Sequence, residues 1–362
     1  MIAADEFNPK RLALARMRRR MTGLALAKNT GLAADTIRRL EKGMHAPDNE
    51  TVDRICLALQ YPRDFFFVSE VHEIDTDAVS FRSFSKMSAR ERDAAIAAGV
   101  VGIELSNYVE RAFELPKIDL IDLSDETNPS IAAASLRQYW RLGEHPIENL
   151  VALMETRGVR LFSLSENTAS VNAFSFWRDD KPFVFLNNFK TAESSIFDAA
   201  HELGHLVMHK NADIRGSRSV EREANDFASS FLMPSNDLRS HLPRFITADD
   251  IIRLKTRWRV SAMALARRCY SIERLSEWQY KSICIELGRR DYRTNEPVTV
   301  GREKSIVWRK ILTHLWTRKV TKADIAKALH LPLDELEGLI WGLTGETDVP
   351  PRGASPQIRV VS

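Results

Sequence analysis

Residues 200–209 read AHELGHLVMH and contain the pattern H-E-x-x-H at His201, Glu202 and His205. Residues four apart lie on one face of a helix, so both imidazoles can bind a single metal ion. Glu202 is offset from His201 by about 100°, close enough to contact a water on the metal without binding the metal itself. Apolar residues surround the motif, namely Phe197, Ala200, Leu203, Leu206 and Val207. The stretch therefore predicts a half-buried helix with a metal site on one face.

A second amphipathic helix is predicted downstream, where residues 219–234 read SVEREANDFASSFLMP. It offers two candidates for a third metal ligand, Glu221 and Glu223, which point about 200° apart on an ideal helix. Glu221 is the better candidate because Asn225 lies four residues later on the same face, where its amide can hydrogen-bond a ligating histidine. Without a metal, the segment would be an ordinary amphipathic core helix.

These donors favour zinc chemistry. Two neutral imidazole nitrogens and one carboxylate hold Zn²⁺ in three positions and leave the fourth for water. The metal lowers the pKa of that water, and Glu202 takes its proton as a general base before passing it to the leaving amine. The expected cofactor is Zn²⁺, and the expected activity is that of a zinc metalloendopeptidase. The competing interpretation is a pair of histidines that share a helix face without a metal.

Three strand candidates precede the motif helix. They read VRLFSLS (residues 159–165), VNAFSFWRD (residues 171–179) and KPFVFLNN (residues 181–188), and turn residues separate them. They predict a small antiparallel sheet ahead of the helix. An edge strand near such a helix can bind an extended substrate by strand addition. The candidate for that edge is the segment of Phe183, Val184, Phe185, Leu186 and Asn187.

The N-terminal residues 8–67 predict a separate helical unit. Two short helices are joined by a turn at Thr30 and Gly31, and their apolar residues are expected to pack together as a helix-turn-helix: Ala27, Leu32, Ile37 and Leu40. Between Phe7 and His45 there are ten Lys or Arg residues and two acidic residues. This excess of positive charge is the footprint expected of a module that contacts phosphate, although a solvated basic face would look the same.

The residues expected to contact double-stranded DNA are Thr22, Lys28, Ala33, Ala34, Asp35, Arg38 and Arg39. The start of the third helix offers few hydrogen-bond donors to base edges, whereas Arg38 and Arg39 lie one turn on and can reach phosphate or guanine. The alternative is a helix-turn-helix kept only for packing or dimerisation. Proteins of this kind that bind two half-sites do so as dimers, so a homodimer is compatible with this domain.

The rest of the chain divides by pattern into a connector with a long helix (residues 68–129), a mixed α and β domain (residues 130–297), a helical C-terminal region (residues 298–345) and a flexible tail (residues 346–362). Residues 247–292 are rich in basic side chains, and their pattern predicts two consecutive helices that resemble a second helix-turn-helix. They either contact DNA or form the end of the mixed domain, and a family resemblance implies the latter. A later helix carries Asp334, Glu335 and Glu337, so it is expected to pack or to bind protein rather than phosphate.

Composition excludes several classes of protein. The chain has no run approaching the roughly 20 apolar residues of a membrane span, and its N-terminus lacks a signal-peptide pattern, so no membrane contact is expected. Cys56, Cys269 and Cys284 are too far apart in sequence to indicate a disulfide framework or a thiolate zinc site. The cytoplasm is the expected location.

The N-terminal unit resembles the XRE (Cro/C1-type) helix-turn-helix family. The pattern appears as Leu26-Ala27, Thr30-Gly31, Thr36-Ile37, Glu41-Lys42-Gly43 and Pro47. The chain departs from that family at Gly23, where glutamine is common, and at Ala33, where serine often caps the recognition helix. The resemblance implies DNA binding, while the departures reduce what the recognition helix can read.

The sequence AHELGHLVMH, a spacer and EREANDFASSFLMP are together similar to the ImmA/IrrE family of metallopeptidases, as are AFSFW and KPFVFLNN upstream. The resemblance implies a thermolysin-like zinc site with His201, His205 and Glu221 as ligands and Glu202 as the general base. It also implies a protein substrate such as a transcriptional repressor, cleaved in stress response, mobile-element transfer or phage defence. The chain departs from its relatives in lacking an arginine-rich approach to the motif.

Two other functions remain open at this point. The first is an XRE-family transcriptional regulator in which the peptidase fold is a sensor or scaffold without turnover. The second is an antitoxin that acts by protein interaction and needs no metal. The enzyme is favoured, because a scaffold has no need for Glu202, a carboxylate that does not bind the metal.

Overall fold

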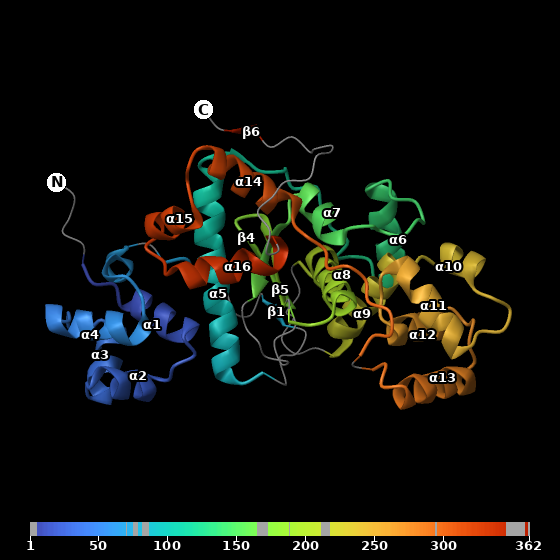
Figure 1. The fold of residues 1–362 in the computed structure, drawn as a ribbon, viewed down its shortest axis with the longest axis horizontal. Helices are drawn as coiled ribbons and strands as arrows, with labels where there is room; N and C mark the ends of the chain where they lie inside the picture. The colour runs from blue at the N-terminus through green and yellow to red at the C-terminus, as the bar shows by residue number, and fades with distance from the viewer. Residues whose placement is uncertain are drawn as a thin grey trace.

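The computed structural model of the chain describes residues 6–69, 71–74, 79–81, 87–164, 173–187, 189–210, 218–293, 295–344 and 359–360. Within these residues the molecule is mostly helical, and a small β-sheet lies near its centre (Figure 1). The α+β, mostly helical architecture expected from the sequence is therefore confirmed. The N-terminal helices lie at one end of the molecule and helices α10 to α13 at the other.

The N-terminal unit consists of α1 (Pro9–Arg18), α2 (Gly23–Thr30), α3 (Ala34–Glu41), α4 (Asn49–Leu59) and a 3₁₀ turn at Arg63–Phe67. Local sequence sets the helix ends. The Thr22 hydroxyl caps α2 by accepting a hydrogen bond from the Ala25 amide at 3.1 Å. Gly31 ends α2 with a φ of 69°, a left-handed conformation that glycine adopts without strain. Leu26, Ala27, Ile37 and Leu40 are buried between the helices, and Leu32 is partly buried against them.

The main sheet contains β1 (Ser80–Phe81), β3 (Arg160–Leu164), β4 (Ala173–Arg178) and β5 (Lys181–Asn187), in the order β1-β4-β5-β3. A separate pair joins β2 (Phe113–Glu114) to β6 (Arg359–Val360). Strands β4 and β5 form a hairpin, and its two-residue turn at Asp179 and Asp180 has φ values of 49° and 56°. Positive φ at both positions matches the right-handed twist of the flanking strands.

Two expectations about this sheet were wrong. The sheet is mixed rather than wholly antiparallel, because β3 pairs with β5 in parallel. Strand β4 runs opposite to β3, and β5 runs opposite to β4, so β3 and β5 point in the same direction. Strand β5 lies between β4 and β3 and pairs with both. The second error follows from the first. The segment Phe183–Asn187 is not an edge strand, since β5 is hydrogen-bonded on both sides.

Helices cover both faces of the sheet. One face carries stacked aromatic rings from three strands: Phe162, Phe174, Phe176, Phe183 and Phe185. Helix α5 (Ala89–Glu110) packs on this face. A Cβ at Gly102 would lie 2.5 Å from the Phe185 ring, so the glycine allows the close approach. The opposite face meets α8 (Ala192–Met208), where the Trp177 indole donates to the Leu206 carbonyl at 3.1 Å. Figure 1 shows the strands between α5 and α8.

The remaining helices are α6 (Pro129–Tyr139), α7 (Leu150–Thr156), α9 (Arg218–Leu232), α10 (Ser235–His241), α11 (Ala248–Trp258), α12 (Ala262–Ser271), α13 (Glu277–Arg289), α14 (Ile306–Thr317), α15 (Lys322–Ala328) and α16 (Leu333–Thr344). The last three return to the sheet and to α5 (Figure 1). The C-terminal region is therefore part of the structure around the sheet and not an appendage to it.

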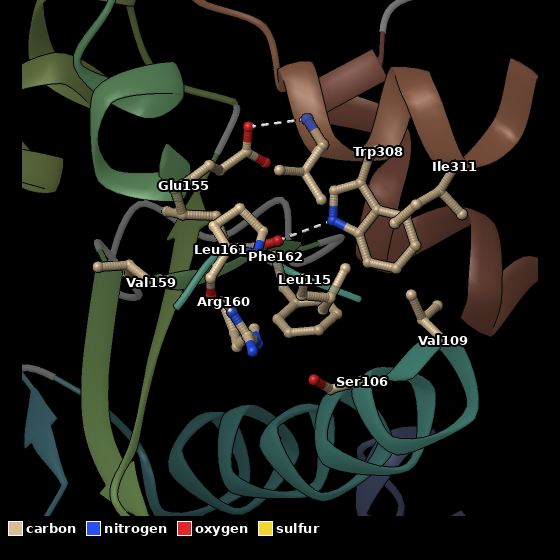
Figure 2. A pocket seen from close by; sticks show the side chains of 12 residues that line it. Ser106, Val109, Leu115, Glu155, Val159, Arg160, Leu161, Phe162, Trp308 and Ile311 are labelled. Atoms are coloured by element: carbon tan, nitrogen blue, oxygen red, sulfur yellow. Dashed lines mark hydrogen bonds between the residues drawn. The ribbon is translucent and has the colours of Figure 1, made fainter. Parts of the chain in front are cut away.

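Figure 2 shows how α14 is anchored beside β3. The Trp308 indole donates to the Leu161 carbonyl at 2.9 Å. The buried Glu155 carboxylate accepts from the Ile306 and Val307 amides at 2.8 and 3.1 Å and so caps α14. Burial raises the pKa of Glu155 to about 7, although these donors act against the increase. The cavity here has a volume of about 20 Å³, room for one water.

Ion pairs attach the N-terminal unit to the rest of the chain. Arg18 of α1 pairs with Glu335 of α16 at 2.8 Å, and both side chains are buried. Arg19 pairs with Asp334 at 2.6 Å. Arg11 pairs with Glu104 of α5 at 2.8 Å. The acidic start of α16 therefore packs against the rest of the chain, as the sequence analysis expected. Its partners Arg18 and Arg19 belong to the basic residues that had suggested DNA binding, so their charges are neutralised within the chain.

Candidate metal centre

Helices α8 and α9 carry the predicted metal ligands. The Thr191 hydroxyl caps α8 by accepting from the Ser194 amide at 3.2 Å. The two helices approach closely at Gly204, where a Cβ would lie 2.9 Å from the Phe227 ring. Gly204 belongs to the H-E-x-x-H motif, so its lack of a side chain lets the first turn of α9 reach the two histidines. That turn contains Glu221.

The structure brings His201, His205 and Glu221 together. The Nε2 atoms of the two histidines lie 3.0 Å apart. The Glu221 carboxylate oxygens lie 3.5 Å from Nε2 of His201 and 3.4 Å from Nε2 of His205. Tetrahedral zinc with ligand bonds of about 2.1 Å places neighbouring donor atoms about 3.4 Å apart. The donor set and its spacing therefore fit a zinc ion, with both histidines buried and Glu221 partly exposed.

The electrostatics of Glu221 suit a metal ligand. Burial alone would raise its pKa, but hydrogen bonds and positive charge from His201 and His205 outweigh burial and lower the pKa to about 2. The carboxylate is therefore ionised at neutral pH. Glu223, the other candidate, points away and lies 3.1 Å from Nε2 of His209 instead.

A hydrogen-bonded chain holds the ring of His205. Its Nδ1 lies 3.1 Å from Nδ1 of His209, and Nε2 of His209 lies 3.1 Å from a Glu223 oxygen. Burial and the charge of His205 lower the pKa of His209, which favours the neutral form of its ring. When Nε2 of His205 binds a metal, its Nδ1–H donates to His209, and His209 donates in turn to Glu223. This arrangement fixes both the tautomer and the orientation of His205.

The expected role of Asn225 was wrong. Its side-chain amide donates to the backbone carbonyl of Glu221 at 2.6 Å rather than to a ligating histidine. The reason is local, because an amide four residues along a helix reaches the carbonyl of the preceding turn. The support for a ligand comes instead from His209 and Glu223.

Glu202 is fully buried beside the metal ligands. Its Oε2 accepts a hydrogen bond from the Ser175 hydroxyl of β4 at 2.7 Å. The sequence analysis missed Ser175. A signal was present, because Ser175 is a small polar residue between Phe174 and Phe176 in a strand whose face toward α8 is otherwise apolar. Strand alternation places Ser175 on that face, opposite the phenylalanine rings.

The sheet edge nearest this site is occupied by the chain itself. Strand β1, in the connector that follows the N-terminal unit, pairs antiparallel with β4 through Ser80 and Ser175 and through Phe81 and Phe174. Since Ser175 contacts Glu202, β4 is the strand next to the metal centre. Within the described residues, the outer strands of this sheet are β1 and β3, so β1 takes the place beside β4 where an extended substrate strand could otherwise pair.

The predicted DNA-contact residues lie on the exposed side of the N-terminal unit. Lys28, Ala33, Ala34, Asp35, Arg38 and Arg39 are exposed, and Thr22 serves as the cap of α2. Arg38 and Arg39 both pair with Asp35, at 2.5 and 2.6 Å. The charge of Asp35 therefore offsets part of the positive charge on this face of α3.

The basic residues of α11 and α12 and the residue between them mostly serve internal contacts. Lys255 is fully buried between Glu193 and Glu296, at 3.0 and 2.9 Å. Arg257 pairs with Asp237, Arg259 pairs with Glu303, and Arg268 donates to the Met233 carbonyl. These contacts favour the assignment of residues 247–292 to the end of the mixed domain over contact with DNA. Arg267 differs from the others, since it makes no ion pair among the described residues.

None of the helices in the described part of the chain combines the length and the apolar character that crossing a bilayer requires.

Comparison with family models gives two matches. Residues 12–66 match the model described as Helix-turn-helix, and residues 154–270 match the Peptidase_M78 model, described as IrrE N-terminal-like domain. Curated proteins gave no match. The two resemblances drawn from the sequence motifs are confirmed: the chain joins an XRE-type helix-turn-helix domain to an IrrE-like domain of the M78 peptidase family.

Proposed function

We propose that the chain is a zinc-dependent endopeptidase fused to a DNA-binding helix-turn-helix. The observation that carries this proposal is the convergence of His201, His205 and Glu221 beside the buried carboxylate of Glu202. A carboxylate buried next to three metal ligands, yet outside the donor set, is what a general base requires and what a scaffold does not. The match to the IrrE-like peptidase model agrees with this interpretation.

Each residue has a defined task in the proposed reaction. His201, His205 and Glu221 would hold the zinc ion, which would supply Lewis acidity toward the scissile carbonyl and the attacking water. Glu202 takes the proton of that water and returns it to the leaving amine. Ser175 orients the Glu202 carboxylate by donating to its Oε2. The neutral His209 keeps the His205 ring in place, so the ligand does not have to reorient during catalysis.

The proposed substrate is a protein, and a transcriptional repressor fits best with the attached DNA-binding domain. Cleavage of a repressor would release the genes that it controls, in stress response, mobile-element transfer or phage defence. The helix-turn-helix match supports binding of double-stranded DNA by the same chain. Because Asp35 pairs with both arginines of α3, we expect binding dominated by phosphate contacts rather than by base readout.

Metal content and cleavage test this proposal together. The purified full-length protein is equilibrated with zinc, and its metal content is measured beside Glu221→Gln and the matched control Glu223→Gln. We expect about one zinc per chain in the wild type and in the control, and loss of zinc in Glu221→Gln. The zinc-loaded protein is then incubated with a proteome-derived peptide mixture, and new peptide ends are identified by mass spectrometry. Chelation should abolish cleavage, and added zinc should restore it.

Two results would contradict the proposal in different ways. A wild-type protein that binds no zinc even in excess metal would exclude the peptidase. A protein that binds zinc and DNA but cleaves no peptide would instead be a transcriptional regulator whose peptidase fold is a sensor or scaffold.

A further inference from the structure

A cleft opens beside the metal centre between α8, α9, α12 and α13, with a volume of about 520 Å³. Phe197 lines it from α8, one turn before His201, and Arg222 and Asn225 line it from α9, one and four residues after Glu221. Since one helical turn spans about 5.4 Å, a peptide bound at the metal ligands has a neighbouring side chain within reach of this cleft.

Most charges in the cleft are already compensated. Lys190 pairs with Asp198 at 2.8 Å, and Glu193 pairs with Lys255 at 3.0 Å. Asp226 also lines the cleft, and its charge acts on Arg268, which is buried behind the wall. These charged groups stabilise the walls of the cleft. A ligand could bind to them only if an ion pair within the protein were broken.

Two guanidinium groups in the lining, those of Arg222 and Arg267, differ from these compensated charges. Among the described residues, neither Arg222 nor Arg267 makes an ion pair, and Arg267 interacts with the hydroxyl of Tyr280. Arg267 is nevertheless held in place, since its guanidinium carbon lies 5.4 Å from the Tyr270 ring centroid and 5.9 Å from that of Tyr280. The two tyrosine rings stack on each other at 5.0 Å.

Stacking prepares Arg267 for a specific class of ligand. A guanidinium resting on aromatic rings keeps its N–H groups in the plane of its fork, the geometry that pairs with a carboxylate through two parallel hydrogen bonds. Because the stack already restricts the side chain, less conformational entropy is lost on binding. Arg222 supplies a second positive charge on the wall that carries Glu221.

We propose that this cleft is a specificity subsite for an acidic side chain, Glu or Asp, close to the scissile bond of the substrate. This inference rests on the proposed peptidase function and names the class of sequence that the site selects. Arg267 and Arg222 bind the carboxylate, while Phe197 and Met263 contact the methylene groups of the same side chain.

Peptide hydroxamates test the subsite without turnover, because the hydroxamate group binds zinc. Two C-terminally amidated dipeptide hydroxamates that differ only by glutamate or glutamine are titrated calorimetrically into the zinc-loaded full-length protein. We expect the glutamate compound to bind about tenfold more tightly, since hydrogen bonds to charged groups are the stronger ones. The preference should vanish or reverse in Arg222→Glu/Arg267→Glu, whose zinc content should equal that of the wild type. Arg289→Glu, an exposed arginine of α13 outside the cleft, is the matched control and should keep the preference.

The outcomes separate the subsite from the proposed function. Tight binding of both hydroxamates without a charge preference would overturn the subsite and leave the zinc site intact. A preference that survives the double substitution would place acidic recognition elsewhere and also overturn it. If the protein holds no zinc and binds neither compound, the proposed function fails and the subsite fails with it.

Discussion

The metal centre and the exposed face of α3 hold their charged side chains in opposite ways. At the metal centre the contacts join different elements, since Glu221 of α9 reaches the histidines of α8 and Ser175 of β4 holds Glu202. On α3, Asp35 pairs with the two arginines of its own helix, and these side chains are 47 to 57% exposed. Buried networks are strongly coupled, whereas exposed ion pairs contribute little. Substitutions should therefore have large effects in the first region and small ones in the second.

The largest effect is expected for Glu202→Gln. Loss of the general base should lower kcat by about 10²- to 10⁴-fold while zinc is retained, because Glu202 is outside the donor set. Cleavage of a peptide identified from the mixture and the zinc content are measured side by side. Ser175→Ala should cause a smaller loss, since it only frees the orientation of the carboxylate. Wild-type cleavage by Glu202→Gln would show that another group acts as the base.

A smaller effect is expected one contact away from the metal. His209→Ala removes the group that orients His205, so zinc affinity should fall by about 10- to 100-fold. Competition with a chromophoric chelator measures the change. Glu223→Gln keeps the His209 ring and an acceptor oxygen, so it should lower zinc affinity less than His209→Ala does. Unchanged affinity in His209→Ala would mean that the histidine is only a packing residue.

The close approach of α8 and α9 can be tested through Gly204→Ala. The new methyl group would meet the Phe227 ring, so the free energy of unfolding should fall by about 1–3 kcal/mol. Urea unfolding of the metal-free protein measures this change without a contribution from zinc binding. Gly301→Ala is the matched control, because a Cβ there meets nothing within 4 Å. Equal stability of the two variants would contradict the tight packing of the helices.

The smallest effect is expected on α3. Asp35→Asn releases Arg38 and Arg39 from their exposed ion pairs and should strengthen binding to random-sequence duplex DNA by about two- to fivefold at low salt. Fluorescence anisotropy measures the affinity. Glu50→Gln breaks a comparable exposed pair with Arg54 on α4 and serves as the control for a general change in charge. Weaker binding by Asp35→Asn would show that Asp35 itself contacts the DNA.

Sequence reasoning succeeded where the relevant contacts are local. The spacing of His201 and His205 depends on one helix turn, and the angle of about 200° between Glu221 and Glu223 lets only one of the two face these histidines. The turn at Thr30 and Gly31 is equally local. Each of these features follows from a few consecutive residues, so the helix pattern alone was enough to predict it.

Apart from Asn225, whose amide bonds within its own helix, the failures concern contacts between distant segments. Whether β5 lies at an edge depends on where β3 pairs, and strand order leaves no trace in the alternation of a single strand. The same holds for Arg18 and Glu335, which are 317 residues apart in sequence. The sequence showed that α16 is acidic and α1 is basic, but only the folded chain shows that they are partners.

The short strand β1 and the long helix α5 have a consequence for dissecting this protein. A fragment beginning at residue 130 would contain every proposed metal ligand, yet it would lack both elements. The phenylalanine face of the sheet would lose its cover, and the backbone of Phe174 and Ser175 would lose its pairing partner. An uncovered apolar sheet with an open edge recruits other copies of itself. An isolated fragment that carries the M78 peptidase domain must therefore start before Ser80, inside the region that joins it to the helix-turn-helix unit.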